Sequence, residues 1–402
     1  MALCEDKRVI DTSWNFKEAN TKEYTHGLHT YPAMMIPQVA RRLFEEYGQN
    51  AETVVDPFMG SGTTLVEAML KKNTKKLYGL EINPLATLIS KVKTTSLKPE
   101  PLVAEFDSLK HNCAKLPEQP KPTFQNIDFW FKPNVIGSLS KLKASIEAIK
   151  NKDKKDFFSV CFSETVRYVS NTRNCEFKLY RMPEEKLKDY NPEVLAVFEK
   201  IVNKNIAHMK EFYSSANEQK VEVNILKQDT RLITSIPTAS CDFLVTSPPY
   251  GDSRTTVAYG QFSRLGSQWL GYENNEVKNV DKNGLGGIPT KDLMHNLKSD
   301  SLNQILEQIK RQDKKRAKDV LSFYVDFDKC TDEINRIMKH GSYLCFVVGN
   351  RTVKKVNIPT DKIIAELFMN KFSYTHNKTI VRDIPSKRMP KANSPSNKKG
   401  EL

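Results

Sequence analysis

The residues best suited to chemistry follow a short apolar stretch at 243–245. That stretch is typical of a buried strand, and shortly after it come Ser247, Pro248, Pro249 and Tyr250. Proline has no amide hydrogen to give to a sheet, so the strand must end there. The stiff loop that follows has a hydroxyl, an aromatic ring and carbonyls that can accept hydrogen bonds. Such loops at strand ends hold chemistry in many α/β proteins, although a plain double-proline turn has the same pattern.

A second candidate loop, DPFMGSGTT at 56–64, follows a short apolar strand and opens a helix. Gly60 and Gly62 let the backbone approach a ligand closely, and the helix amides behind them favour polar or anionic groups. No lysine follows the second glycine, so this is not a Walker phosphate loop. Glu81 ends the next strand, where a carboxylate can accept hydrogen bonds from both hydroxyls of a ribose. The pairing predicts a nucleoside-containing cofactor, whereas the glycines alone would also fit a tight strand–helix turn.

Asp229 ends a further strand candidate at 221–229. There it could accept a hydrogen bond from an adenine amino group, or equally cap a turn with Thr230. Successive strand ends thus offer polar groups along one edge of a sheet, and the next strand ends in the double-proline loop.

The elements that must position these groups form a strand–loop–helix–strand unit at 53–84, the start of a doubly wound sheet. Residues 95–220 have helical periodicity without strand alternation, and strand character returns at 221. We therefore predict an α/β fold with a Rossmann-like doubly wound sheet, a mainly helical insertion and an irregular region after the double proline. A hairpin is expected at the sheet edge, at 372–384. The expected units are 1–94, the first part of the main domain; 95–220, the helical insertion; 221–250, main domain; 251–310, a lid or recognition region; 311–385, main domain; and 386–402, a basic tail.

Charge and composition narrow the class of protein. The 402 residues include 62 Lys and Arg against 48 Asp and Glu, for a net charge of +14. This surplus favours nucleic acid as a partner, although it also aids solubility. No apolar stretch reaches the roughly 20 residues of a membrane span, and the charged start does not suit a signal peptide. The seven cysteines show no Cys-x-x-Cys pairing. We expect a cytoplasmic protein with reduced thiols, without a membrane anchor or a metal site.

Taken together, the motifs resemble those of the S-adenosylmethionine-dependent DNA methyltransferases that modify exocyclic amino groups. DPFMGSGTT is similar to their Phe-x-Gly-x-Gly cofactor motif, and SPPY to their catalytic (Asp/Asn/Ser)-Pro-Pro-(Tyr/Phe) motif. HTYPAMMIP at 29–37 resembles the segment that closes over the methionine part of the cofactor. The resemblance spans 29–250 but leaves out 95–220 and 251–310. It implies that S-adenosylmethionine is bound by Tyr31, Asp56, Phe58, Gly60, Gly62, Thr63, Thr64, Glu81, Ile82, Asn83 and Asp229.

The resemblance also implies a mechanism. An exocyclic amine is a poor nucleophile because its lone pair is delocalised into the base. If the Ser247 hydroxyl and the Pro248 carbonyl accept its two N–H bonds, the nitrogen can become tetrahedral and point its lone pair at the methyl group. Pro249 stiffens the loop, and Tyr250 would stack on a base flipped out of the duplex. Family members usually have Ser at this position when cytosine N4 is the target, so we expect N4-cytosine. Hydrogen bonding alone would also permit adenine N6.

Two regions are candidates for reading double-stranded DNA. One is 163–181 in the insertion, where basic and aromatic residues interleave, and the other is 251–272, beside the catalytic loop. The first could instead be a scaffold with a solvated basic face, and the second a lid that orders on DNA. The candidates are Arg167, Arg173, Lys178 and Arg181 with Tyr168, Asn171 and Tyr180 in the first region, and Arg254, Tyr259, Arg264 and Trp269 in the second.

The resemblance implies a prokaryotic restriction–modification role, with a cognate restriction endonuclease as a separate chain. Competing interpretations are an RNA amino-methyltransferase, a protein glutamine methyltransferase, and a DNA-binding protein that has lost the chemistry.

Overall fold

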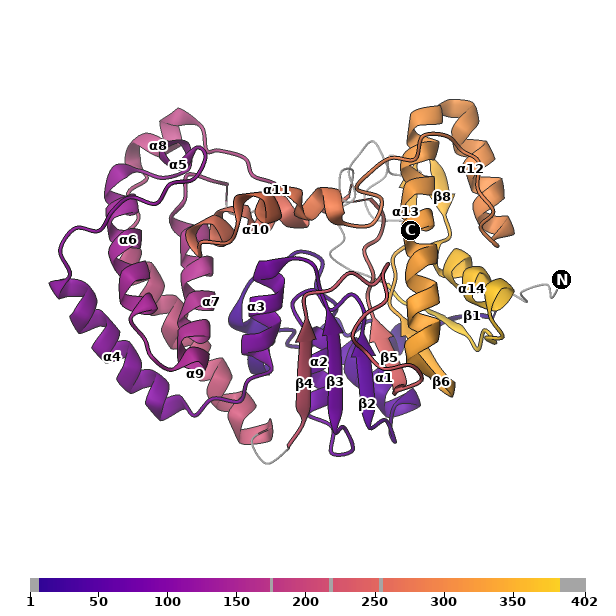
Figure 1. The fold of residues 1–402 in the computed structure, drawn as a ribbon, viewed down its shortest axis with the longest axis horizontal. Coiled ribbons are helices and arrows are strands. Elements are labelled where there is room, and N and C mark those ends of the chain that lie inside the picture. The colour runs from indigo at the N-terminus through magenta and orange to yellow at the C-terminus, as the bar shows by residue number, and fades with distance from the viewer. Residues whose placement is uncertain (1–6, 174–175, 217–219, 253–255, 384–402) are drawn as a thin grey trace.

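A parallel sheet forms the centre of the molecule (Figure 1). The computed structural model describes residues 7–173, 176–216, 220–252 and 256–383. Within these ranges the central sheet has five strands, which are β2 (Thr53–Asp56), β3 (Lys76–Leu80), β4 (Glu222–Leu226), β5 (Cys241–Thr246) and β6 (Met338–Phe346). They lie in the order β4-β3-β2-β5-β6, and each neighbouring pair is parallel. The predicted doubly wound α/β fold is confirmed.

The strand order reverses between β2 and β5. From β2 the chain moves outward through β3 to β4, and it then returns to the other side of β2 to form β5 and β6. In open parallel sheets, ligands bind at the carboxyl ends of the strands where the order reverses. The ends of β2 and β5 are therefore the expected place for a site.

Helices cover both faces of this sheet. Val54 belongs to one hydrophobic core cluster and its neighbour Val55 to the other, as the alternation of side chains along a strand requires. The first face packs against α1 (Pro37–Tyr47), α2 (Thr63–Met69) and α3 (Pro84–Lys93). The second packs against α12 (Asp300–Gln312), α13 (Lys314–Ile337) and α14 (Thr360–Lys371).

A helical lobe lies beside the sheet, on the left of Figure 1. Its helices are α4 (Pro99–Lys115), α5 (Ile127–Trp130), α6 (Pro133–Glu147), α7 (Lys152–Val169), α8 (Glu184–Asp189) and α9 (Val194–Ala216). Phe158 and Phe162 of α7 belong to the same core cluster as Leu85 and Ile89 of α3. The lobe therefore extends the core of the first face of the sheet.

The segment after the double proline contains α10 (Tyr259–Trp269) and α11 (Asn274–Asn283). The prediction of an irregular region at 251–310 is therefore wrong for the two segments that form these helices. Phe262, Leu265 and Trp269 are buried at helical spacing, which gives α10 one apolar face. Frequent Gly and Asn in the surrounding sequence made this periodicity hard to recognise.

The first described strand pairs with the last described one. Strand β1 (Arg8–Ile10) lies parallel to β9 (Thr379–Val381), so the edge hairpin expected at 372–384 is wrong. A hairpin does form from β7 (Arg351–Val353) and β8 (Val356–Ile358). The 3-10 helices η1 (Thr12–Trp14) and η2 (Tyr24–Leu28) lead from β1 to α1. None of the described helices is long and apolar enough to cross a membrane.

Candidate active site

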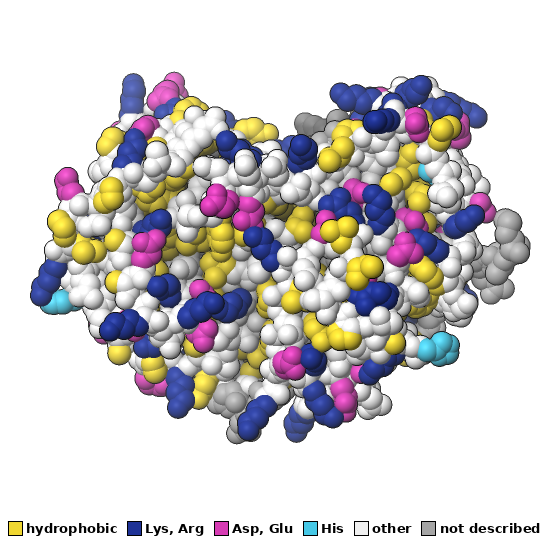
Figure 2. Space-filling model, viewed as in Figure 1, with side chains coloured by type: hydrophobic (Ala, Val, Ile, Leu, Met, Phe, Trp, Pro, Cys, Tyr) yellow, Lys and Arg dark blue, Asp and Glu magenta, His cyan; other side chains and the backbone are white. Residues whose placement is uncertain are grey.

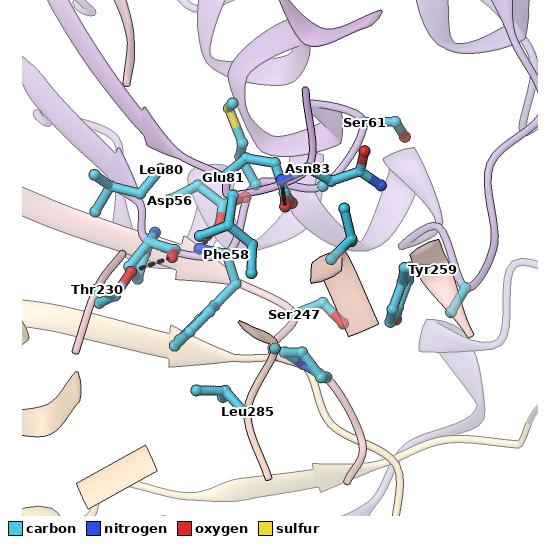
Figure 3. A pocket seen from close by; sticks show the side chains of 18 of the residues that line it. Asp56, Phe58, Ser61, Leu80, Glu81, Asn83, Thr230, Ser247, Tyr259 and Leu285 are labelled. Carbon is cyan, nitrogen blue, oxygen red and sulfur yellow. Dashed lines mark hydrogen bonds between the residues drawn. The ribbon is translucent and has the colours of Figure 1, made fainter. Parts of the chain in front are cut away.

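A cavity opens where the strand order reverses, at the carboxyl ends of β2, β3 and β5. It encloses about 1040 Å³ of space, partly open to solvent, and Figure 3 shows side chains from these strand ends around it. The residues predicted to bind the cofactor that line this cavity are Tyr31, Asp56, Phe58, Gly60, Thr63, Glu81, Ile82, Asn83 and Asp229. Ser247 and Pro249 line it as well. The two loops singled out by sequence thus share one cavity.

The glycine loop owes its shape to backbone that only glycine adopts readily. Gly60 and Gly62 have φ values of 50° and 82°. A Cβ on Gly62 would lie 2.9 Å from the Ser90 hydroxyl oxygen, and that hydroxyl donates to the Gly60 carbonyl at 2.8 Å. Gly62 therefore serves the packing of the loop on α3. Thr64 is buried behind the loop, where its hydroxyl donates to the Val245 carbonyl at 3.1 Å.

Glu81 presents a carboxyl group to the cavity from the end of β3. One carboxylate oxygen accepts the amide hydrogen of Asn83 at 2.8 Å. Burial raises the pKa of Glu81 to about 7, because a charged carboxylate loses hydration there. Its remaining lone pairs can accept hydrogen bonds from a pair of ligand hydroxyls. Phe58 flanks this wall and stacks on Phe327 of α13, with ring centroids 6.1 Å apart.

Asp229 lines the cavity beyond the end of β4 and is held by an arginine that sequence reasoning missed. Its two carboxylate oxygens each accept from Nε of Arg231 at 3.0 Å, and Arg231 also contacts Asp326 at 3.1 Å. Thr230 is not the partner of Asp229: its hydroxyl donates to the Pro57 carbonyl at 2.7 Å. Asp229 still lines the cavity, and Arg231 fixes the position of its carboxylate.

Tyr259, a candidate for contacting DNA, lines the same cavity as the candidates for binding the cofactor. Its ring stacks on Tyr31, with centroids 5.8 Å apart and an angle of 26° between the planes. Burial raises the pKa of both hydroxyl groups. Asn83 ties the pair to α10, because its Nδ2 donates to the Tyr31 hydroxyl at 3.1 Å and to Ser263 Oγ at 2.7 Å. The first turn of α10 therefore forms a wall of the cavity.

The Ser-Pro-Pro-Tyr loop leaves β5 beside the glycine loop. The Thr246 hydroxyl donates to the Asp56 carboxylate at 2.6 Å, and the next residue, Ser247, faces the cavity. Pro248 is buried. Tyr250 lies partly buried beyond the cavity wall, within electrostatic range of Arg382.

Arg351 of β7 supports the end of this loop and carries no signal in the sequence. A Cβ on Gly251, whose φ is 151°, would lie 2.1 Å from Nη1 of Arg351. The same Nη1 donates to the buried Asp252 carboxylate at 3.3 Å. Arg351 thus packs directly against the backbone that follows the double proline.

Trp269, predicted to contact DNA, is a core residue. It is fully buried, and its ring makes edge-to-face contacts with Phe124, Phe131 and Phe162 at centroid distances of 5.8, 5.5 and 6.1 Å. Its position at the end of α10 directs it into the helical lobe, so the prediction is wrong.

Several candidates in the insertion hold that lobe together. Asn171 is buried and donates to the Phe129 carbonyl at 3.2 Å, which excludes it as a base-reading residue in this conformation. Arg167 stacks on Phe262 at 4.1 Å, and Arg181 stacks on Phe129 at 4.7 Å. These contacts give the three side chains a structural role in the lobe, and a DNA contact by the partly exposed Arg167 and Arg181 stays a prediction.

The other candidates differ in exposure. The exposed ones are Tyr168, Arg173 and Tyr180, and the partly buried ones are Lys178 and Arg264. Arg254 and the tail at 386–402 lie outside the described residues. Within the described ranges, no group of three or more His, Cys, Asp or Glu side chains is placed to hold a metal ion.

The fold and the cavity fit one class of protein, the methyltransferases that use S-adenosylmethionine, to which the comparisons below assign the chain. The cavity suits this cofactor because it is large, and because the carboxyl groups of Glu81 and Asp229 and the apolar side chains of Phe58 and Ile82 line it together.

Known proteins support this assignment and narrow it. Residues 2–91 match the model of a family described as DNA methylase. The Type II methyltransferase M.MvaI of Kocuria varians is 44% identical over 420 residues, covering 98% of this chain and 92% of that protein. The Type II methyltransferase M.MjaII of Methanocaldococcus jannaschii is 32% identical over 94 residues, covering 22% of this chain and 17% of that protein. The chain belongs to the family of type II exocyclic-amino DNA methyltransferases of restriction–modification systems.

A solved structure, the rRNA methyltransferase aviRa from Streptomyces viridochromogenes, is similar at 12% identity. The match covers 57% of this chain and 65% of that one, with a TM-score of 0.24, too low to carry an argument.

Proposed function

We propose that this enzyme transfers the methyl group of S-adenosylmethionine to the N4 amino group of cytosine in double-stranded DNA. The observation that carries the proposal is the placement of Ser247. It follows β5 directly and lines the same cavity as Glu81 and Asp56, on a different wall (Figure 3). A base that entered beside Ser247 would lie next to the cofactor.

The chain's own groups would do three things in this reaction. Glu81 and Asp229 would bind the nucleoside part of the cofactor, which supplies an electrophilic methyl group. The Ser247 hydroxyl and the Pro248 carbonyl would accept the two N–H bonds of the target amine and direct its lone pair toward that methyl. The N–CH3 bond would form as the sulfonium S–CH3 bond breaks, and the nitrogen would release one proton to solvent to give the neutral methylated amine.

Cytosine is favoured over adenine because the first residue of the motif is Ser rather than Asp or Asn. Adenine N6 is the second candidate, because the same two acceptors could hold its amino group. An RNA substrate is the third. The cognate restriction endonuclease and the cytoplasmic location remain predictions that follow from the family.

The test is to identify the methylated nucleoside. The protein is incubated with unmethylated duplex DNA and methyl-labelled S-adenosylmethionine, the DNA is hydrolysed, and the labelled nucleoside is identified by mass. RNA of the same sequence is the matched control. N4-methylcytosine in DNA alone is the expected result. N6-methyladenine would contradict the proposed base, and label in RNA alone would contradict the proposed substrate.

A further inference from the structure

Four exposed cationic side chains gather where two turns meet: Arg311, Lys314, Lys315 and Lys355. We call this group the basic tip. The first three lie at the junction of α12 and α13, and the fourth lies in the turn between β7 and β8. Figure 2 shows Lys and Arg side chains over the upper right lobe, where Figure 1 places these elements.

The basic tip lies toward the edge of the sheet formed by the carboxyl ends of the strands, where the active-site cavity opens. Helix α13 ends at Ile337 and β6 begins at Met338, so the last turn of the helix lies at the amino end of the strand. The helix has 24 residues and is therefore about 36 Å long, enough to carry its first residue to the carboxyl edge of the sheet. Ser247 follows β5 at that edge. Figure 2 shows the surface hollowed between this lobe and the helical lobe.

The carboxylate of Asp313, which lies between these cations in the sequence, already has partners within the chain. Asp313 caps α13 by accepting the amide hydrogen of Arg316 at 3.0 Å, and its other oxygen pairs with Lys354 at 3.1 Å. This contact fastens the hairpin turn to the helix junction. In the part of the chain that the structure describes, no carboxylate lies within ion-pair distance of the four cations of the basic tip.

The hairpin turn carries lysine where the backbone favours other residues. Lys354 and Lys355 have φ values of 50° and 63°, and they are the two residues between the paired Val353 and Val356. Two-residue turns with positive φ at both positions favour Asn and Gly, because a Cβ is strained there. Lysine at Lys355 therefore lowers stability without forming an internal ion pair, which points to a use for its charge outside the chain.

We propose that the basic tip binds the phosphate backbone of duplex DNA beside the base that enters the cavity. This inference rests on DNA as the substrate and adds the surface that grips it. Exposed Lys and Arg groups contact phosphates without reading sequence, and they set the position of the duplex on the protein. The basic tip thus holds the duplex at the rim of the hollow, while the chemistry takes place at Ser247.

The test compares two triple variants of equal charge. The first is Lys314→Gln, Lys315→Gln and Lys355→Gln. The control is Lys72→Gln, Lys210→Gln and Lys220→Gln, three exposed lysines of which the first and last lie near the amino ends of β3 and β4. Binding of a fluorescent duplex is measured across salt concentrations, together with S-adenosylmethionine binding and the methylation kcat and KM for DNA.

Each lost phosphate contact reduces the slope of log affinity against log salt by about 0.9, so the first variant should lose about 2 to 3 units of slope. Its KM for DNA should rise at least about tenfold at low salt, with cofactor binding unchanged. The control should keep the wild-type slope. Equal slopes for both variants would overturn the proposal. The product base, identified in the same reactions, tests the cytosine assignment separately.

A single substitution separates this role from a structural one. Lys355→Gly relieves the backbone at φ 63° and removes one charge. The proposal predicts a higher unfolding temperature together with weaker DNA binding, and a damaged fold cannot produce this combination. A more stable variant with unchanged DNA affinity would overturn the proposal.

Discussion

The hydroxyl of Thr246 donates a hydrogen bond to the carboxylate of Asp56 at 2.6 Å, and both groups are buried. Asp56 ends β2 at the start of the glycine loop, and Thr246 ends β5 just before Ser247. The contact therefore links the glycine loop to the Ser-Pro-Pro-Tyr loop. Thr64 makes a second link through its hydrogen bond to the Val245 carbonyl.

Thr246→Val should weaken this link while keeping the side-chain shape. Asp56 would then lose a donor in a site where burial already raises its pKa to about 6. We expect the free energy of unfolding to fall by about 1–3 kcal/mol, as for other buried polar groups left without a partner. Urea denaturation measures this, with Thr246→Ser as the control that keeps the hydroxyl. A Val variant as stable as the wild type would show that the link contributes little.

Cofactor binding should depend on pH through Glu81. Its pKa of about 7 means that the group is mostly protonated at pH 6 and mostly ionised at pH 8. An ionised carboxylate is the better acceptor for two ribose hydroxyls, so S-adenosylmethionine affinity should rise with pH, up to about tenfold per unit below pH 7. Calorimetry from pH 5.5 to 8 tests this. Glu81→Gln should bind weakly and lose that dependence, whereas a pH-independent wild type would contradict it.

The same pKa has a consequence for stability without cofactor. Between pH 4.5 and about 7 the folded protein retains a proton on Glu81 that the unfolded chain releases. The unfolded state then binds fewer protons, so this group's contribution to the free energy of unfolding falls as pH rises through that window.

Gly251→Ala should slow methylation more than it weakens cofactor binding, because Gly251 lies at the edge of the cavity, next to the catalytic loop. Its φ of 151° and the Cβ clash at 2.1 Å with Arg351 would force the loop after Tyr250 to move. Displacements near 1 Å at a reacting centre reduce rates by about 100-fold, and we expect a loss of that size in kcat. Gly137→Ala in α6 is the control, because a Cβ there meets nothing within 4 Å. Equal kcat values for the two variants would show that the loop tolerates the change.

Trp269→Ala should destabilise the protein by about 3–5 kcal/mol, the range for large aromatic residues removed from a core. The fully buried ring fills the space between three phenylalanines, and the substitution would leave a cavity. Leu195→Ala, at a side chain 45% exposed on α9, should change stability by less than about 0.5 kcal/mol. Trp269→Ala with normal stability but impaired DNA binding would restore the sequence-based prediction.

The shared cavity of the candidate cofactor residues could be predicted, because their placement depends on local motifs and on one general property of parallel sheets. Gly60, Glu81 and Asp229 each follow a strand, and the carboxyl ends of parallel strands meet at one edge. The sequence could not show which residues of α10 line the cavity and which belong to the core. Tyr259 and Trp269 look equally suited to DNA in the sequence, and only the packing of the helical lobe sends one to the cavity and the other to the core.

Residues that act across long distances in the chain gave no local signal. Arg351 and Arg231 are single arginines in a basic chain, and their roles depend on Gly251 and Asp229 being brought to them by the fold. The pairing of β1 with β9 likewise joins strands about 370 residues apart, which no local pattern indicates.

Single-turnover methylation with Ser247→Ala is the sharpest test of whether Ser247 acts in the methyl-transfer step. The rate is measured with S-adenosylmethionine and duplex DNA bound in advance, beside Ser61→Ala, which removes a hydroxyl from the glycine loop of the same cavity. We expect a rate about 10²–10³-fold lower for Ser247→Ala, with the affinities for cofactor and DNA close to wild type. A rate equal to that of the wild type would contradict it.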